Sequence, residues 1–202
     1  PPAAKLVEEK VAEPIKEVQA KEVVQNTDTE FTLVLDRYDP VLPLGAHFDA
    51  SMPTELFVTN VMPHVDGLVQ HAERTSGTQL KAGDFIMSVN GVTGSEMPKE
   101  LQSARHLALK VRRPMEFEVE IEKAGGTLGC SITYDAHTGM SLSVSNVLDG
   151  PIQRWNESGS GEKVQEGDRI VCVNGVRGFT SQLLEAIRAA SQLKITLARP
   201  SP

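Results

Sequence analysis

The chain contains the same arrangement of motifs twice. Residues 30–114 and 116–200 each begin with Glu-Phe and end with Arg-Pro, and the motifs between them keep their order. A repeat of this length exceeds the units of solenoids and propellers, so each copy is long enough to bury a core of its own. The sequence therefore predicts two duplicated globular domains. The matching motifs are Leu44-Gly45 with Leu128-Gly129, Asn60-Val61 with Asn146-Val147, Gly83-Asp84 with Gly167-Asp168, and Asn90-Gly91-Val92 with Asn174-Gly175-Val176.

The repeat also sets the expected domain limits. We expect a flexible or partly helical N-terminal segment over residues 1–29, a first domain over 30–114 and a second domain over 115–200. Pro14 interrupts the helical spacing of the N-terminal segment, and a proline inside a helix costs about 3 kcal/mol. Only residues 113–115 separate the two flanking strands. A linker this short has little reach, so we expect the domains to be in near contact with restricted relative orientation.

Composition argues against nucleic acid and lipid as direct partners. The chain of 202 residues has a formal net charge of −7, and its Lys and Arg residues form no basic stripe. Binding to nucleic acid requires clustered cations that neutralise phosphates. Lys110, Arg112 and Arg113 are the one basic cluster, and alternation along a strand divides it between two faces.

The cysteine count and the hydropathy indicate an intracellular protein. Cys130 and Cys172 both lie in the second repeat, so the sequence predicts no disulfide framework. A reducing compartment fits this pattern. The sequence has no signal-peptide pattern and no apolar run long enough to cross a bilayer. We expect a cytoplasmic location, peripheral to a membrane only through partners.

Hydrophobic periodicity predicts a mainly β fold. Apolar residues alternate with polar ones at Phe31, Leu33 and Leu35, which is typical of a half-buried strand. Two of the expected strands run into Asn-Gly turns, which favour antiparallel hairpins. Further strands are expected over residues 56–61, 85–89, 107–112, 117–121, 142–147, 169–173 and 193–199.

A late amphipathic helix is expected in each repeat. In the second repeat, Leu183, Leu184 and Ile187 share one face, and Thr180 or Ser181 is the expected N-cap. The first repeat has a shorter helix, with Pro98 in its first turn, where proline is tolerated. That helix would be capped by Ser95 and contain Met97, Leu101 and Ala104, and further short helices are expected near residues 68–72 and 152–156.

Three motifs in this order resemble those of PDZ domains. They are a Leu-Gly turn before a strand, a Gly-Asp pair before the strand that ends in Asn-Gly, and the late helix. Both repeats contain all three, although residues 38–43 before the first turn depart from the typical glycines. The resemblance to a tandem of PDZ domains implies an α+β fold that is mainly β. Each domain would be a partly open antiparallel β-barrel or sandwich with one main and one short helix.

The Leu-Gly turn is the expected site of chemistry. Successive amides turned inward form an anion site without a titratable side chain, and glycine lets the backbone approach a ligand. An extended peptide would add to the edge of the following strand, with its terminal carboxylate on these amides. The resemblance assigns the amides to Leu44, Gly45 and Ala46 in the first domain and to Leu128, Gly129 and Cys130 in the second.

The resemblance also implies a peptide groove between this strand and the late helix. A histidine at the first helix position commonly favours Ser or Thr two residues before the peptide end. That position maps to Thr180 in the second domain and to Gly94 or Ser95 in the first, so this peptide class is not indicated. The groove residues would be Phe48 and Leu101 in the first domain and Ile132, Thr180, Leu184 and Ile187 in the second.

The sequence therefore predicts a scaffold or adaptor that binds C-terminal tails of other proteins, membrane proteins among the candidates. The alternative is a regulatory substrate-recognition fragment of a larger protease, because PDZ modules also accompany proteases. No enzyme activity, cofactor or metal is expected: the sequence has no Gly-x-Ser-x-Gly elbow, and His64, Asp66 and His71 lack ligand periodicity. The oligomeric state and the peptide sequence are left open.

Overall fold

A computed structural model describes residues 29–39, 41–123 and 126–202. The expected N-terminal segment therefore lies outside the described residues up to residue 28. The first part of the chain forms β1 (Glu30–Asp36), β2 (Ala46–Asp49), β3 (Leu56–Val61), α1 (Leu68–Ser76), β4 (Phe85–Val89), the 3-10 turn η1 (Gly94–Glu96), α2 (Met97–Ser103) and β5 (His106–Arg112). The second part forms β6 (Pro114–Glu122), β7 (Cys130–Thr133), β8 (Leu142–Val147), α3 (Pro151–Ser158), β9 (Arg169–Val173), α4 (Thr180–Ala189) and β10 (Gln192–Pro200).

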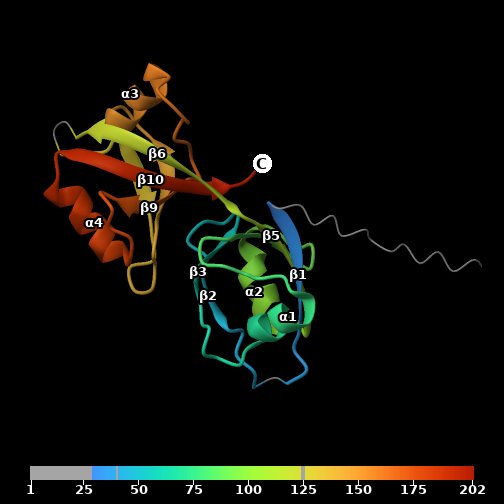
Figure 1. The fold of residues 1–202 in the computed structure, drawn as a ribbon. Coiled ribbons are helices and arrows are strands. Elements are labelled where there is room, and N and C mark those ends of the chain that lie inside the picture. The colour runs from blue at the N-terminus through green and yellow to red at the C-terminus, as the bar shows by residue number, and fades with distance from the viewer. Residues whose placement is uncertain (1–28, 40, 124–125) are drawn as a thin grey trace, which may run out of the picture.

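The described residues form two five-stranded antiparallel sheets with the same topology. The order is β1-β5-β4-β3-β2 in the first sheet and β6-β10-β9-β8-β7 in the second. Figure 1 shows the two resulting units, which we call the first module (β1 to β5) and the second module (β6 to β10). The predicted α+β fold class is confirmed, and neither sheet closes into a barrel. The domain limits at residues 30–114 and 115–200 remain our proposal.

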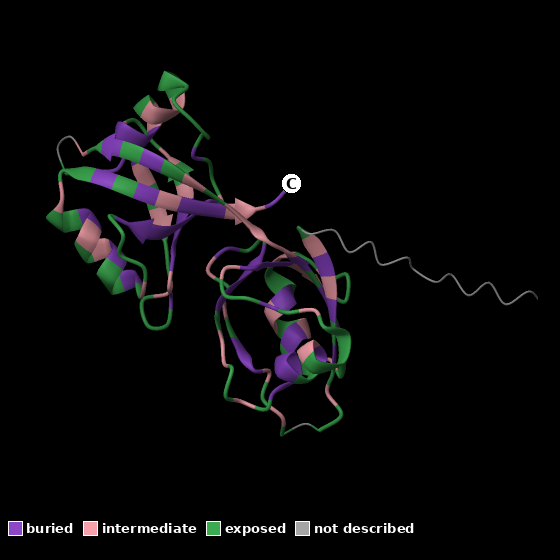
Figure 2. Cartoon of the chain, viewed as in Figure 1, coloured by how far each residue is buried: buried purple, intermediate pink, exposed green. Residues whose placement is uncertain are grey.

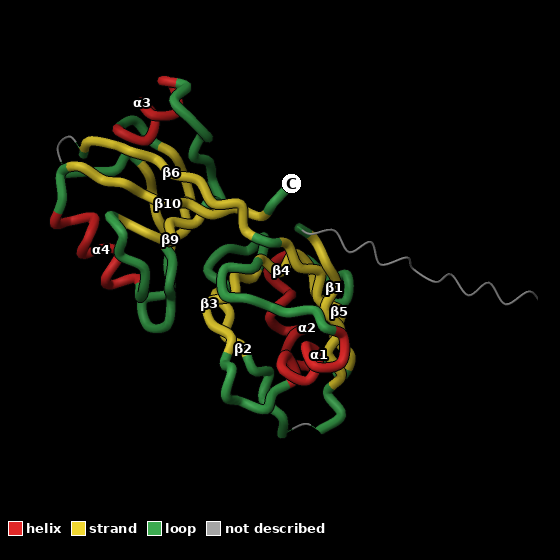
Figure 3. The backbone as a smooth tube through the Cα atoms, in the orientation of Figure 1, coloured by secondary structure: helices red, strands yellow, loops and turns green. Residues whose placement is uncertain are grey.

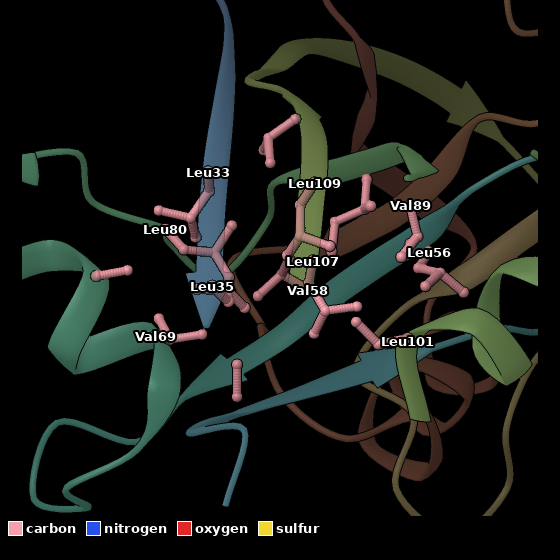
Figure 4. Close-up of a cluster of buried hydrophobic side chains, with 14 of the residues drawn as sticks. Leu33, Leu35, Leu56, Val58, Val69, Leu80, Val89, Leu101, Leu107 and Leu109 are labelled. Carbon is pink, nitrogen blue, oxygen red and sulfur yellow. The ribbon is translucent and has the colours of Figure 1, made fainter. Parts of the chain in front are cut away.

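Alternation along the strands builds a separate core in each module. In the first module, Leu33 pairs with Leu109 and Leu35 with Leu107, and all four side chains are buried. Figure 4 shows these leucines converging with residues of β3 and α1. Burying one such side chain contributes about 1.5–3 kcal/mol. Along β6 and β10, buried and exposed residues alternate in the same way (Figure 2).

The starts of the late helices differ from the prediction. Thr180 is the first residue of α4, and Phe179 occupies the N-cap position. The Phe179 amide is satisfied by Gln182, whose Oε1 accepts it at 3.0 Å. In the first module a 3-10 turn begins at Gly94, and Glu96 precedes α2. The predicted caps at Thr180, Ser181 and Ser95 are therefore wrong, because Phe179 and Glu96 occupy the N-cap positions of α4 and α2.

The Gly-Asp motif of each module has a structural role. Asp84 accepts a hydrogen bond from Arg113 Nη1 at 2.6 Å, and Asp168 accepts two from Arg199, at 2.8 and 2.9 Å. Each guanidinium also lies over a phenylalanine ring of its own module, 4.5 Å from the centroid. Burial raises the pKa of both carboxyl groups, and the arginines oppose this shift.

The linker between the modules is built into the second sheet. Pro114 pairs with Pro200 at the end of the ladder between β6 and β10. Beside them, Ser201 donates to the Arg113 carbonyl from both its amide and its hydroxyl, each at 2.9 Å. The chain therefore passes from β5 into β6 without a free connecting segment.

A buried arginine joins the two modules. Arg169, at the start of β9, is fully buried, and its guanidinium donates to Asp49 Oδ2 at 2.8 Å and Glu55 Oε1 at 3.4 Å in the first module. It also lies 4.8 Å from the centroid of the Phe57 ring. An apolar cluster surrounds this contact, formed by Phe57 and Phe85 from the first module and Val171 and Ala198 from the second.

We predict that Arg169→Leu lowers the free energy of unfolding by about 3–5 kcal/mol, because Asp49 and Glu55 would remain buried without a countercharge. Urea denaturation followed by circular dichroism measures the change. Arg177→Leu is the matched control, since it breaks an exposed pair with Glu116 and should cost less than about 1 kcal/mol. Equal losses for the two variants would contradict this assignment.

Candidate functional site

The strand after each Leu-Gly turn lies at the open edge of its sheet. β2 pairs only with β3, and β7 pairs only with β8, in the described part of the chain. Ala46 lies opposite Val61, and the Met62 amide donates to the Gly45 carbonyl at 3.0 Å. In an antiparallel ladder this bond makes Ala46 and Val61 a non-hydrogen-bonded pair, so the Ala46 amide points away from β3. It faces the open edge.

The second module repeats this register. Cys130 lies opposite Val147, and the Leu148 amide donates to the Gly129 carbonyl at 2.8 Å. The Cys130 amide therefore also faces the open edge of its sheet. The two copies of the motif present equivalent amides although their side chains differ.

The carbonyls of both turns are engaged, which orients their amides outward. The Leu44 carbonyl accepts from the Val69 amide in α1, and the Leu128 carbonyl accepts from the Ile152 amide in α3, both at 3.1 Å. Among the described residues, no hydrogen bond uses the amides of the two Leu-Gly pairs as donors. Each turn thus combines satisfied carbonyls with unsatisfied amides, which is the arrangement that binds an anion.

Glycine is required in both turns. Gly45 and Gly129 have φ values of +84° and +76°, a region that disfavours side chains. A Cβ on Gly129 would lie 2.8 Å from the Gly150 Cα atom, so backbone contacts backbone at the start of α3. A Cβ on Gly45 would lie 2.0 Å from Gln70 Oε1.

Gln70 is a site residue that the sequence analysis missed. Its side chain is buried beneath the first turn, where Nε2 donates to the Gly45 carbonyl at 2.9 Å. In the second module the equivalent residue, Gln153, instead contacts Glu157 on the surface. The sequence contains only a weak signal for this role, because a glutamine in a predicted helix does not indicate whether its side chain points to the core or to the surface.

Residues of β2 and α2 line a groove in the first module. Figure 3 marks the positions of these two elements. It has a volume of about 500 Å³ and brings together Leu44, Phe48 and Leu101 of the predicted residues, with Leu42 and Pro98 beside them. Ala46 turns its side chain into the core instead. The groove is therefore mostly apolar and continues from the turn along the helix.

In the second module the predicted residues cluster between β7 and α4. Ile132, Leu184 and Cys130 are partly buried and pack against the core that contains Ile187. Thr180 has different contacts from these residues. It is buried, and its hydroxyl donates to the Asp135 carbonyl at 3.1 Å. Its side chain is thus engaged within the protein.

A basic side chain lies at the C-terminal end of each late helix, α2 and α4. The sequence analysis identified neither of these two residues. Arg37 donates to the carbonyls of Gln102 and Leu101, at 2.6 and 3.2 Å, and lines the first groove. Lys123 donates to the carbonyls of Ile187 and Arg188, at 2.5 and 3.2 Å. Both cations follow the first strand of their module and satisfy terminal helix carbonyls.

The histidine cluster considered for metal binding is dispersed. Asp66 pairs with Arg74 at 2.6 Å, and His71 lies against Tyr38 with ring centroids 5.5 Å apart. The described residues contain no group of three or more His, Cys, Asp or Glu side chains arranged to hold a metal. They also include no helix that is both long and apolar enough to span a membrane.

We predict that Gly129→Ala destabilises the chain more than Gly175→Ala. Both glycines have positive φ, so both variants incur a backbone cost of about 1–2 kcal/mol. Only Gly129 faces another backbone, whereas a Cβ on Gly175 meets nothing within 4 Å, so overpacking should add about 1–3 kcal/mol. Thermal and urea unfolding measure the difference, and equal values would show that the turn is not closely packed.

Cys130 is predicted to be an unreactive thiol. Burial raises its pKa to about 11, from an ordinary value of 9.0. A raised thiol pKa lowers the thiolate fraction, and the thiolate is the nucleophile. In a Cys172→Ala chain, the rate of iodoacetamide modification should increase with pH, and the midpoint of this increase should lie at about 11. A midpoint near 9 would contradict the buried environment.

Comparisons with known proteins give structural neighbours only. No protein-family model and no curated protein matches the chain. Among solved structures, "Structure of INAD PDZ45 in complex with NG2 peptide" is 22% identical, with 88% of this chain and 92% of that chain covered and a TM-score of 0.38. "Complex structure of INAD PDZ45 and NORPA CC-PBM" is 20% identical, with 86% and 91% covered and a TM-score of 0.36. Both titles name PDZ domains, the family that the motifs of this chain resemble.

Proposed function

We propose that each module binds the C-terminal end of another polypeptide by β-strand addition. The peptide would lie against the edge of β2 or β7, antiparallel to it, and its main chain would complete the sheet. Its carboxylate would accept hydrogen bonds from the amides of Leu44, Gly45 and Ala46, or of Leu128, Gly129 and Cys130. The observation that carries this proposal is the pair of turns whose carbonyls are satisfied while their amides are not.

Apolar side chains beside the turn support a hydrophobic final residue in the peptide. In the first module, Leu44, Phe48 and Leu101 line the groove next to the amides. In the second module, Ile132, Leu184 and Ile187 occupy the equivalent position. Alternate side chains of an extended peptide point the same way, so the groove would contact the last residue and the residue two before it.

Arg37 supports the carboxylate in the first module. Arg37 lines the groove together with the turn residue Leu44, and its guanidinium is held at the end of α2. Hydrogen bonds to charged groups are stronger than those between neutral groups. Lys123 has the equivalent position in the second module.

We further propose that the tandem is a non-enzymatic adaptor in a reducing, cytoplasmic setting. Two sites on one chain bring two tails together, and linked sites raise avidity when both are engaged. Cys130 and Cys172 are free thiols, which fits such a compartment. Partners would be proteins with accessible C-terminal tails.

Calorimetry with a peptide library tests the proposal. Each peptide is measured with a free carboxylate and as its C-terminal amide, and amidation should weaken binding at least tenfold because it removes the charge that the amides hold. Leu184→Lys should weaken the second site, whereas Ser181→Lys, on the exposed side of α4, adds the same charge without effect. Equal affinities for the two forms of every peptide would refute the carboxylate site.

A further inference from the structure

The connection between β7 and β8 is tied to the start of α4. The Thr180 amide donates to the Gly139 carbonyl at 3.0 Å, and the Thr180 hydroxyl donates to the Asp135 carbonyl at 3.1 Å. The packing is close, because a Cβ on Gly139 would lie 2.9 Å from Thr180 Cγ2. We call residues 135–139 the strap.

The strap is an ordered turn in its own right. The Gly139 amide donates to the Asp135 carbonyl at 3.2 Å. The Asp135 carboxylate accepts hydrogen bonds from the amides of His137 and Thr138 and from the Thr138 hydroxyl. These bonds lower the pKa of Asp135, so its carboxylate holds the turn together at neutral pH.

We call the proposed peptide site between β7 and α4 the second groove, and the strap lies at the end of this site opposite the Leu-Gly turn. Lys123, just before this turn, holds the last carbonyls of α4, while the strap, just after β7, holds the first residue of α4. The helix therefore runs antiparallel to β7, with its C-terminal end at the turn and its N-terminal end at the strap. A peptide whose carboxylate lies at the turn would meet the strap as it leaves the groove.

The first module lacks this connection. Its corresponding loop, residues 50–55, has no hydrogen bond to η1 or α2 among the residues described. Instead this loop contacts the second module. The hydroxyl oxygens of Ser51 and Ser143 are 3.5 Å apart, and Glu55 accepts a hydrogen bond from Arg169. The same loop is thus held by a helix in one module and by the neighbouring module in the other.

We propose that the strap restricts the second groove to the last four residues of a peptide, and that Thr180 determines this length by holding the strap in place. β7 spans Cys130–Thr133, and a strand advances about 3.3 Å per residue, so an antiparallel peptide has room for about four residues between turn and strap. The ligand class of this site is then a short free C-terminal end. This inference rests on the proposed function.

Peptides of two lengths test it on the full chain. The probes are the N-acetylated peptide Val-Lys-Val-Lys-Ala-Val-Ala-Val and its last four residues, both with free carboxylates. Nuclear magnetic resonance titration of the ¹⁵N-labelled chain reports binding at the second site through the amides of Gly129 and Cys130. We expect the two affinities at this site to agree within twofold, because the added residues cannot pair with β7.

Thr180→Pro is designed to release the strap without harming α4. It removes both donors at the first helical position, where proline is favoured, and Phe179 before it has an extended ψ of 152°. The longer peptide should then bind the second site at least fivefold more tightly than the shorter one. Thr180→Ser keeps both donors and should behave like the original chain, and Thr180→Val replaces Thr180→Pro if the latter does not fold.

The outcomes separate the two proposals. If neither peptide shifts Gly129 or Cys130, the proposed function of the second module is overturned, and the strap inference falls with it. If both peptides bind but the longer one binds at least fivefold more tightly in the original chain, only the strap inference is overturned. The same holds if release of the strap gives no gain with length.

Discussion

The hydrogen bonds that hold the carbonyls of the two Leu-Gly turns determine how the rest of the site is arranged. The amides of Val69 and Ile152, at the starts of α1 and α3, take the leucine carbonyls, and the ladder to β3 or β8 takes the glycine carbonyls. Because a peptide unit directs its N–H opposite to its C=O, the Gly45 and Gly129 amides point away from these helices, and the Ala46 and Cys130 amides face the open strand edge. Glycine at positive φ makes this turn possible in both modules.

The two modules use this common turn in different surroundings. In the first, Gln70 supports the Gly45 carbonyl from below, and the loop after β2 is drawn to the second module through Glu55 and Arg169. In the second, the loop after β7 is tied to its own helix at Thr180. Duplicated scaffolds can diverge in this way because loops tolerate changes that the core does not. The contact between the modules therefore holds the loop beside the first groove, whereas the loop beside the second groove is held within its own module.

Much of the fold could be predicted from the sequence, because strand alternation and Asn-Gly turns are local signals. The strands at Leu56–Val61, Phe85–Val89 and Arg169–Val173 lie where the periodicity predicts them. Arg169 shows the limit: its countercharges, Asp49 and Glu55, lie in the other module, so no local pattern indicates a buried arginine. Thr180 was expected to face the groove or cap its helix, but its hydroxyl bonds to a loop whose path depends on tertiary packing. The spacing of residues in the sequence does not predict long-range polar contacts of this kind.

Amide hydrogen exchange with and without a C-terminal peptide tests the central claim most directly. The account predicts that a free-carboxylate peptide slows exchange at Leu44, Gly45 and Ala46 and at Leu128, Gly129 and Cys130, and that its amidated form does so much less. In the free chain, the Met62 and Val69 amides should already be protected, since they are hydrogen-bonded to the turn. A peptide that binds and leaves the exchange of all six turn amides unchanged would contradict the account.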